Sequence, residues 1–317
     1  MIEVKDLEIT IRTQSHKIQA VRGVSFKLNE GEKLGIVGES GCGKTILMKS
    51  LLQLLPPTAS VDRGEIWYEG KDLVKLQEKE LQKIRGKEIG MIFQDPMTSL
   101  NPTLKVGYQI TEGYLRHFPS ATKKEAEARA LELLVQVGIP EPQLRLEQYP
   151  HVLSGGLRQR IVIALALAAE PRILIADEPT TALDVTVQAQ ILDLLQHLQK
   201  GKSTLLITHD LSLVAAFCDR VLVMYAGQIV EEADVEELFA RPMHPYTQKL
   251  LQSIPRIDGK GERLLPIAGS PPDLSQPIQG CAFCPRCVES MHICREKHPP
   301  FFEKKVRCWL LDPRRVK

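Results

Sequence analysis

The amino-acid sequence predicts an α/β fold with a mostly parallel sheet, and three observations lead to this prediction. Short apolar runs alternate with segments of helical spacing along most of the chain. The runs at 172–176 and 203–207 are largely apolar, which is typical of parallel strands that are buried on both faces. The run at 33–37 leads through a glycine-rich turn into a helical stretch at 46–55. Alternation of this kind indicates an α/β core.

Further elements are expected on either side of this core. Alternating or continuous apolar residues predict strands near 7–11, 24–28, 66–68, 89–93, 221–225 and 228–230. Pro56 and Pro57 are expected to end the first helix. Ala226 and Gly227 lie between the last two of these strands, so we expect a hairpin there.

Residues from about 95 to 155 differ in character and predict a mostly helical insert. Thr122 and Glu125 have the spacing of a capping box at the start of a helix. The apolar spacing over 126–137 is helical, and Gly138 is a typical stop signal. After about residue 241 the chain becomes rich in proline and then dense in cysteine.

The composition excludes several classes of protein. The chain has 317 residues, with 41 Lys and Arg against 39 Asp and Glu, so the net charge of +2 gives no reason to expect a nucleic-acid partner. The longest apolar run, 161–169, is about half of what a membrane span needs. The first residues have neither a basic nor an apolar signal region. We therefore expect neither secretion, nor a membrane span, nor general disorder.

A phosphate-binding loop is the strongest motif in the sequence. The pattern G-x-x-x-x-G-K-T comprises Gly38, Glu39, Ser40, Gly41, Cys42, Gly43, Lys44 and Thr45. Glycines let backbone N–H groups surround phosphates, and the following helix adds a partial positive charge. Lys44 would neutralise the β- and γ-phosphates, and the Thr45 hydroxyl would bind Mg²⁺. A chance glycine turn is the alternative, but the predicted flanking strand and helix favour the phosphate loop.

An acidic pair follows the apolar run at 172–176. Asp177 suits the coordination shell of Mg²⁺, and Glu178 suits a general base that polarises the attacking water. A strand that ends in Asp-Glu is common at protein surfaces, so the pair gains its meaning from the phosphate loop upstream.

A serine–glycine turn comprises Ser154, Gly155, Gly156 and Leu157. Ser154 can cap the next helix, and the glycines allow close backbone approach. Together with the phosphate loop and the acidic pair, this turn resembles the signature motif of ABC transporter ATP-binding subunits. The resemblance covers about residues 1–240. It implies a P-loop NTPase core with a mostly parallel sheet, N-terminal antiparallel strands and a helical subdomain at about 95–155. Residues 241–317 would form a cysteine-rich C-terminal extension.

The resemblance also implies roles for single residues. In the family, two subunits enclose two ATP molecules, and each signature turn contacts the γ-phosphate that the opposite subunit holds. Gln94 matches the glutamine that senses Mg²⁺ and water and contacts the membrane partner. Asp184, in the segment 182–184, matches the loop that crosses the dimer interface, and His209 matches the switch histidine at the γ-phosphate. Ile11 stands where the family usually has an adenine-stacking aromatic residue, which predicts weaker ATP affinity.

A finer resemblance is to the oligopeptide/dipeptide branch of importers, which includes nickel importers. The segments 154–160, 179–188, 244–251 and 253–256 carry it, and in this branch Leu157 in place of glutamine is ordinary. The branch implies a second ATPase subunit, two transmembrane permease subunits, an extracellular or periplasmic binding protein, and a place on the cytoplasmic face of the membrane. A nickel importer is the alternative. A non-transport ABC ATPase is a third possibility, disfavoured by the single phosphate loop and the absence of heptads.

Five of the seven cysteines lie in the last 37 residues, and without an export signal they indicate a metal site rather than disulfides. Cys281, Cys287, Cys294 and Cys308 resemble the cysteines that hold a [4Fe–4S] cluster in some branch members. The C-x-x-C spacing around the extra Cys284 would also suit Zn²⁺, and unligated thiols remain a third alternative.

Two interpretations of Cys42, which lies in the phosphate loop far from the other cysteines, also stay open. It is either a tolerated small side chain or an oxidisable thiol whose pKa is lowered at a helix N-terminus.

Overall fold

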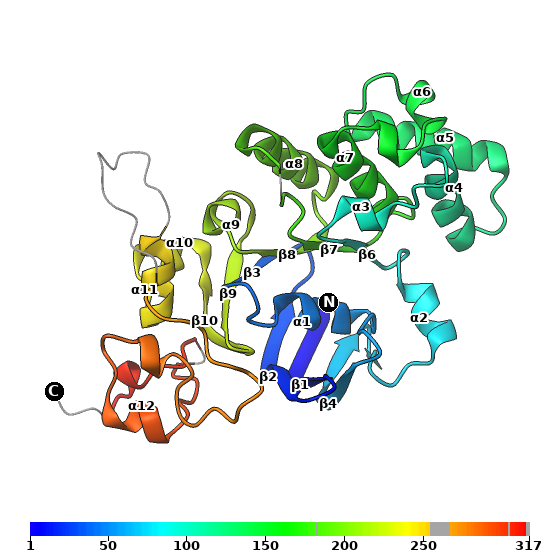
Figure 1. Cartoon of the computed structure of the whole chain (residues 1–317). Coiled ribbons are helices and arrows are strands. Elements are labelled where there is room, and N and C mark those ends of the chain that lie inside the picture. The colour runs from blue at the N-terminus through cyan, green and yellow to red at the C-terminus, as the bar shows by residue number, and fades with distance from the viewer. Residues whose placement is uncertain (182, 254–266, 304, 315–317) are drawn as a thin grey trace. The chain divides into compact units, whose positions relative to one another are not determined.

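The computed structural model describes residues 1–181, 183–253, 267–303 and 305–314 (Figure 1). The chain divides into two compact units. The first comprises Met1–Leu28, Lys33–Lys75 and Ile207–Lys317, and the second comprises Asn29–Glu32 and Leu76–Leu206. These limits differ from the domain boundary that the motifs place at about residue 240, which stays a prediction.

The first unit contains an antiparallel sheet in the order β2 (Lys17–Leu28), β1 (Ile2–Arg12), β4 (Ala59–Tyr68) and β5 (Lys71–Asp72). It also contains β3 (Lys33–Val37), which pairs parallel with β9 (Arg220–Tyr225). A hairpin joins β9 to β10 (Gln228–Asp234) through Ala226 and Gly227, both of which have positive φ. The predicted N-terminal antiparallel strands and the predicted hairpin are confirmed.

The helices of the first unit are α1 (Lys44–Leu51), α9 (Leu211–Phe217), α10 (Val235–Ala240), α11 (Pro245–Gln252) and α12 (His292–Glu296), with 3₁₀ turns at Cys284–Arg286 and Trp309–Leu311. The prediction that Pro56 and Pro57 end the first helix was wrong, because α1 ends at Leu51. Gln53 adopts a left-handed φ of 51°, and the Gln53 and Leu54 amides bond to the Ser50 and Lys49 carbonyls. This local cap terminates the helix before the prolines.

The core of the first unit includes residues of the C-terminal extension. The side chains of β3, β9 and α9 share one buried cluster with Tyr246 and Phe283. The Tyr225 ring lies 4.6 Å from that of Tyr246 and 5.3 Å from that of Phe283, centroid to centroid. Aromatic contacts of this kind add to the free energy gained from burial.

The second unit places β6 (Ile89–Ile92), β7 (Ile173–Asp177) and β8 (Ser203–Thr208) next to one another in that order, although the last two residues of β8 belong to the first unit. β6 and β7 pair in parallel. Every residue of β7 is buried, as predicted for a parallel strand covered on both faces.

The remainder of the second unit is mostly helical. Its helices are α2 (Glu78–Ile84), α3 (Pro96–Ser99), α4 (Val106–His117), α5 (Lys123–Gln136), α6 (Pro142–Leu146), α7 (Gly155–Ala166) and α8 (Val185–Leu198), with a 3₁₀ turn at Pro150–Val152. Figure 1 shows α4, α5, α6 and α7 grouped together in green. The capping box of Thr122 and Glu125 is present at the start of α5. In the described part of the chain, no helix has the length and apolarity to cross a membrane.

Candidate active site

The phosphate loop connects β3 to α1 in the first unit, as the motif predicts. The Lys44 side chain is buried within the loop, and its ammonium donates to the Gly38 carbonyl at 2.7 Å and to the Glu39 carbonyl at 3.0 Å. No side-chain hydrogen bond caps the start of α1 at Gly43. A lysine ammonium at an uncapped helix N-terminus is suited to bind phosphate oxygens.

Two glycines of the loop are required by close backbone contacts. A Cβ at Gly38 would lie 2.1 Å from the Met224 carbonyl oxygen, and a Cβ at Gly43 would lie 2.2 Å from the Ala20 carbonyl oxygen. Gly43 also has a φ of 104°, which side chains rarely allow. The backbones of strands β9 and β2 therefore lie against the loop and restrict its path.

Cys42 is buried in this loop, 5% exposed, and burial raises the pKa of its thiol. The hypothesis of a lowered pKa is therefore wrong, since desolvation outweighs the nearby Lys44 ammonium. The reading of Cys42 as a tolerated small side chain fits this environment.

The acidic pair lies at the end of β7 in the second unit. Asp177 is buried, and Glu178 follows with a left-handed φ of 47°. One carboxylate oxygen of Glu178 accepts hydrogen bonds from the Gln94 amide at 3.2 Å and from the Thr181 hydroxyl at 2.8 Å. The structure thus brings together Gln94 and Glu178, which are 84 residues apart in sequence.

Sequence reasoning did not single out Thr181. A hydroxyl three residues after a candidate general base is the signal that would have found it.

The signature turn begins α7. The Ser154 hydroxyl accepts from the Leu157 amide at 3.4 Å, so the predicted N-cap is confirmed. Gly155 is exposed, and a Cβ added there would meet nothing within 4 Å. Gly156 is half-buried. The first turn of α7 therefore leaves room for another group to approach its backbone.

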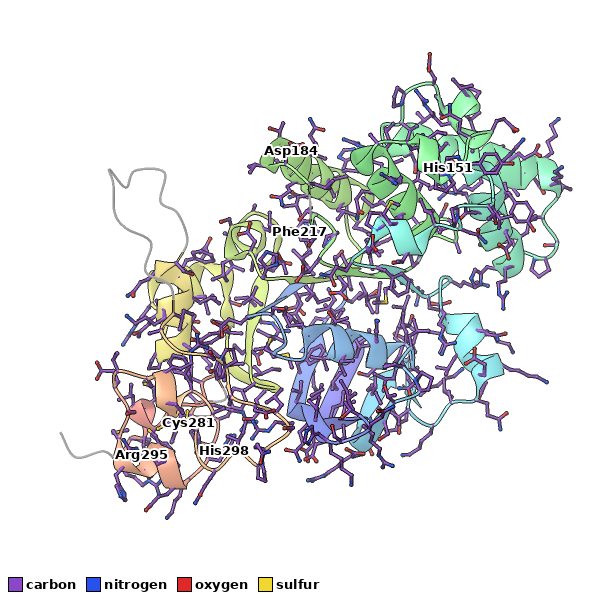
Figure 2. All side chains as sticks on the ribbon, viewed as in Figure 1. His151, Asp184, Phe217, Cys281, Arg295 and His298 are labelled. Atoms are coloured by element: carbon purple, nitrogen blue, oxygen red, sulfur yellow. The ribbon has the colours of Figure 1, made fainter. Side chains whose placement is uncertain are left out.

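Asp184 caps α8 by accepting from the Val187 amide at 2.9 Å, and Figure 2 labels it at that helix start. Residue 182 of the predicted interface loop lies outside the described residues, as do positions 254–256 of the segment 253–256.

The predicted site residues divide between the two units. The phosphate loop, Ile11 and His209 belong to the first unit, whereas Gln94, the acidic pair, the signature turn and Asp184 belong to the second. His209 is exposed directly after β8, and Ile11 is half-buried on β1. Their roles at adenine and the γ-phosphate stay predictions.

The cysteines of the C-terminal extension lie around one small pocket. Its volume is about 300 Å³, solvent at its mouth included, and its cysteines are Cys281, Cys284, Cys287, Cys294 and Cys308. Burial raises the pKa of the Cys281 thiol to about 12 and that of the Cys308 thiol to about 11. Among the described residues, no group of three or more His, Cys, Asp or Glu side chains is arranged to hold a metal ion. The predicted iron–sulfur cluster therefore has no support from the arrangement of these thiols.

Known proteins resemble the chain over its whole length. The ABC transporter family model matches residues 21–181, and the model of the oligopeptide/dipeptide transporter C-terminal region matches 230–294. The oligopeptide transport ATP-binding protein OppD of Bacillus subtilis is 56% identical, over 99% of this chain and 89% of that protein. The dipeptide transport ATP-binding protein DppD of Lactococcus lactis is 51% identical, over 100% of this chain and 93% of that protein.

A solved structure also resembles the fold. The dimeric ATP-binding cassette MJ0796, bound to ADP and Pi in a post-hydrolysis state, has a TM-score of 0.67 at 31% identity. It covers 74% of this chain, and the match takes in 99% of the cassette. These features define an ATP-hydrolysing P-loop protein. The chain belongs to the ATP-binding subunits of the ABC transporter family.

Proposed function

We propose that this chain is the ATP-hydrolysing, energy-coupling subunit of an ABC importer for oligopeptides or dipeptides. The chain is similar over nearly its full length to subunits named for oligopeptide and dipeptide transport, which supports this cargo class. The match of residues 230–294 to the oligopeptide/dipeptide transporter C-terminal region supports it as well.

The observation that carries the ATPase proposal is the placement of the Glu178 carboxylate. It lies at the end of a buried strand, oriented by the Gln94 amide and the Thr181 hydroxyl. A carboxylate held in this way can take a proton from water as that water attacks the γ-phosphate. Asp177 beside it and Thr45 of the loop would hold Mg²⁺, which neutralises charge on the phosphates.

The partners in this proposal are a second ATPase subunit, two permease subunits and an extracellular or periplasmic binding protein. The dimeric cassette that resembles this chain supports the first of these. Each subunit would bind one ATP with its own phosphate loop and present Ser154 and its glycines to the other. The chain would lie on the cytoplasmic face of the membrane, attached through the permeases.

Uptake by the assembled transporter distinguishes peptide from nickel as cargo. In cells that lack the gene for this chain, we expect the wild-type chain to restore uptake of a radiolabelled di- or oligopeptide. The Glu178→Gln variant is expected not to restore it. Restored uptake of ⁶³Ni²⁺ without any peptide uptake would contradict the peptide assignment and favour the nickel alternative.

We further propose that Cys281, Cys287, Cys294 and Cys308 hold a [4Fe–4S] cluster, with Zn²⁺ as the alternative. Zinc draws four ligands onto one ion, whereas each thiolate of a four-iron cluster binds a different iron. All four of these cysteines line one pocket, and four thiolates are the donor set that either kind of site uses. The cluster would stabilise the fold of the extension, and Cys284 lines the same pocket.

Metal analysis of anaerobically purified protein tests this assignment. We expect about four irons and four sulfides per chain, with visible absorbance from thiolate-to-iron charge transfer. The Cys294→Ser variant is expected to lose most of the iron. Zinc without sulfide would contradict the cluster, and a chain with neither metal would contradict both assignments while leaving the ATPase proposal unaffected.

A further inference from the structure

An arginine of the cysteine-rich segment reaches the phosphate loop. Arg286 lies in the 3₁₀ turn between Cys284 and Cys287. Its guanidinium binds both carboxylate oxygens of Glu39, the second residue of the loop, at 2.6 and 2.9 Å. The Arg286 side chain is 4% exposed and that of Glu39 is 24% exposed. A bidentate Arg–carboxylate pair of this kind fixes both the position and the orientation of the carboxylate.

The backbone of Glu39 is held by the same part of the chain. The Glu39 amide donates to the Tyr246 hydroxyl at 2.9 Å, and Tyr246 is fully buried on α11. Both the side chain and the main chain of Glu39 therefore have partners in the C-terminal extension. The Glu39 carbonyl in turn accepts from the Lys44 ammonium.

Arg286 is itself fixed in place. Its Nε donates to the Ala268 carbonyl at 2.9 Å, and one terminal nitrogen donates to the Ile267 carbonyl at 3.2 Å. The other donates to the Tyr225 hydroxyl at 3.3 Å. The guanidinium also lies 5.8 Å from the centroid of the Tyr225 ring. With so many fixed partners, Arg286 loses little further freedom when it binds Glu39.

This arrangement has an electrostatic consequence. A carboxylate in a phosphate-binding loop repels the phosphates that the loop binds, unless a cation neutralises it. Arg286 is the cation paired with Glu39. We propose that Arg286 is a positioning residue of the nucleotide site, which neutralises Glu39 and fixes it away from the bound phosphates. The proposal rests on the assignment of residues 38–45 as the phosphate loop. It implies that the cysteine-rich segment contributes to nucleotide binding through Arg286.

A charge-compensation experiment on the full chain tests the proposal. The Kd for a non-hydrolysable ATP analogue with Mg²⁺ is measured by calorimetry at low and high salt. Arg286→Met leaves Glu39 unneutralised, so we expect binding about fivefold weaker at low salt, with a smaller deficit at high salt. The double variant Arg286→Met with Glu39→Gln restores a neutral pair, so its Kd is expected within about twofold of the wild type.

Two further variants control for a loss of structure. Arg295→Met removes an exposed arginine of the same segment, labelled in Figure 2, and is expected to bind like the wild type. If Arg286→Met does not fold, the Kd of the single variant Glu39→Gln tests the proposal. That variant leaves the Arg286 charge without its carboxylate partner. We therefore expect its Kd for the ATP analogue to be at least about twofold lower than that of the wild type at low salt.

The possible outcomes are distinct. A double variant as weak as Arg286→Met, or a deficit independent of salt, would mean that Arg286 only supports the local fold and would overturn the proposal. Unchanged Kd in Glu39→Gln would overturn it as well. Lys44→Ala serves to test the loop assignment separately, because normal binding by that variant would refute the loop itself. Lost binding in Lys44→Ala with normal binding in Arg286→Met would refute only the role of Arg286.

Discussion

Glu178→Gln is expected to lower ATP turnover by about 10²–10⁴-fold, the range that general-base catalysis contributes. The amide keeps the shape of the carboxylate and can still bond to Gln94 and Thr181, but it cannot accept a proton from water. Nucleotide binding is expected to persist, because the change leaves the phosphate loop intact. Phosphate release and analogue binding, measured on the same preparation, separate these two effects.

A matched control is available in the same unit. Glu170 also has a positive φ, 56°, and its exposed carboxylate pairs with the largely buried Arg129 at 3.0 Å. Glu170→Gln makes the same chemical change at a similar backbone conformation, and its turnover is expected within about twofold of the wild type. Near-normal phosphate release by Glu178→Gln would refute Glu178 as the general base.

Gly43→Ala is expected to abolish nucleotide binding and to lower the free energy of unfolding by several kcal/mol, on the order of 3–5. Its Cβ would lie 2.2 Å from the Ala20 carbonyl oxygen, so the loop or β2 must move. A moved loop cannot keep its amides and Lys44 directed at the same phosphates. Denaturant unfolding and analogue binding measure the two losses.

Gly41→Ala separates the steric clash from backbone strain. Gly41 also has a left-handed φ, 78°, but a Cβ there would meet nothing within 4 Å. The left-handed conformation costs an alanine roughly 1–2 kcal/mol, so Gly41→Ala is expected to lose about that much stability and to keep measurable binding. Equal losses in the two variants would show that the contact with Ala20 does not matter.

Much of the fold could be predicted because its signals are local. The buried run of β7, the capping box of α5 and the Ser154 cap of α7 each depend on residues close together in the sequence. The phosphate loop is equally local, since one strand, one turn and one helix start contain all of its residues. Local physics determines such elements, so a single sequence reveals them.

The features that sequence reasoning missed depend on tertiary contacts or on a single unusual torsion angle. The end of α1 is set by the left-handed φ of Gln53, a residue with no special preference for that conformation. The raised pKa of Cys42 follows from burial against other parts of the first unit. The pairing of Arg286 with Glu39 joins residues 247 positions apart, and no spacing rule connects them.

The first unit draws its strands from both ends of the chain, and this has a consequence for protein synthesis. β3 pairs with β9, and the same cluster is completed by Tyr246 and Phe283. A chain emerging from the ribosome cannot form that cluster until nearly its whole length has been made. Most of the second unit is continuous, from Leu76 to Leu206, so its contacts become available while translation continues. The early β-strands of the first unit must therefore stay unaggregated during that interval.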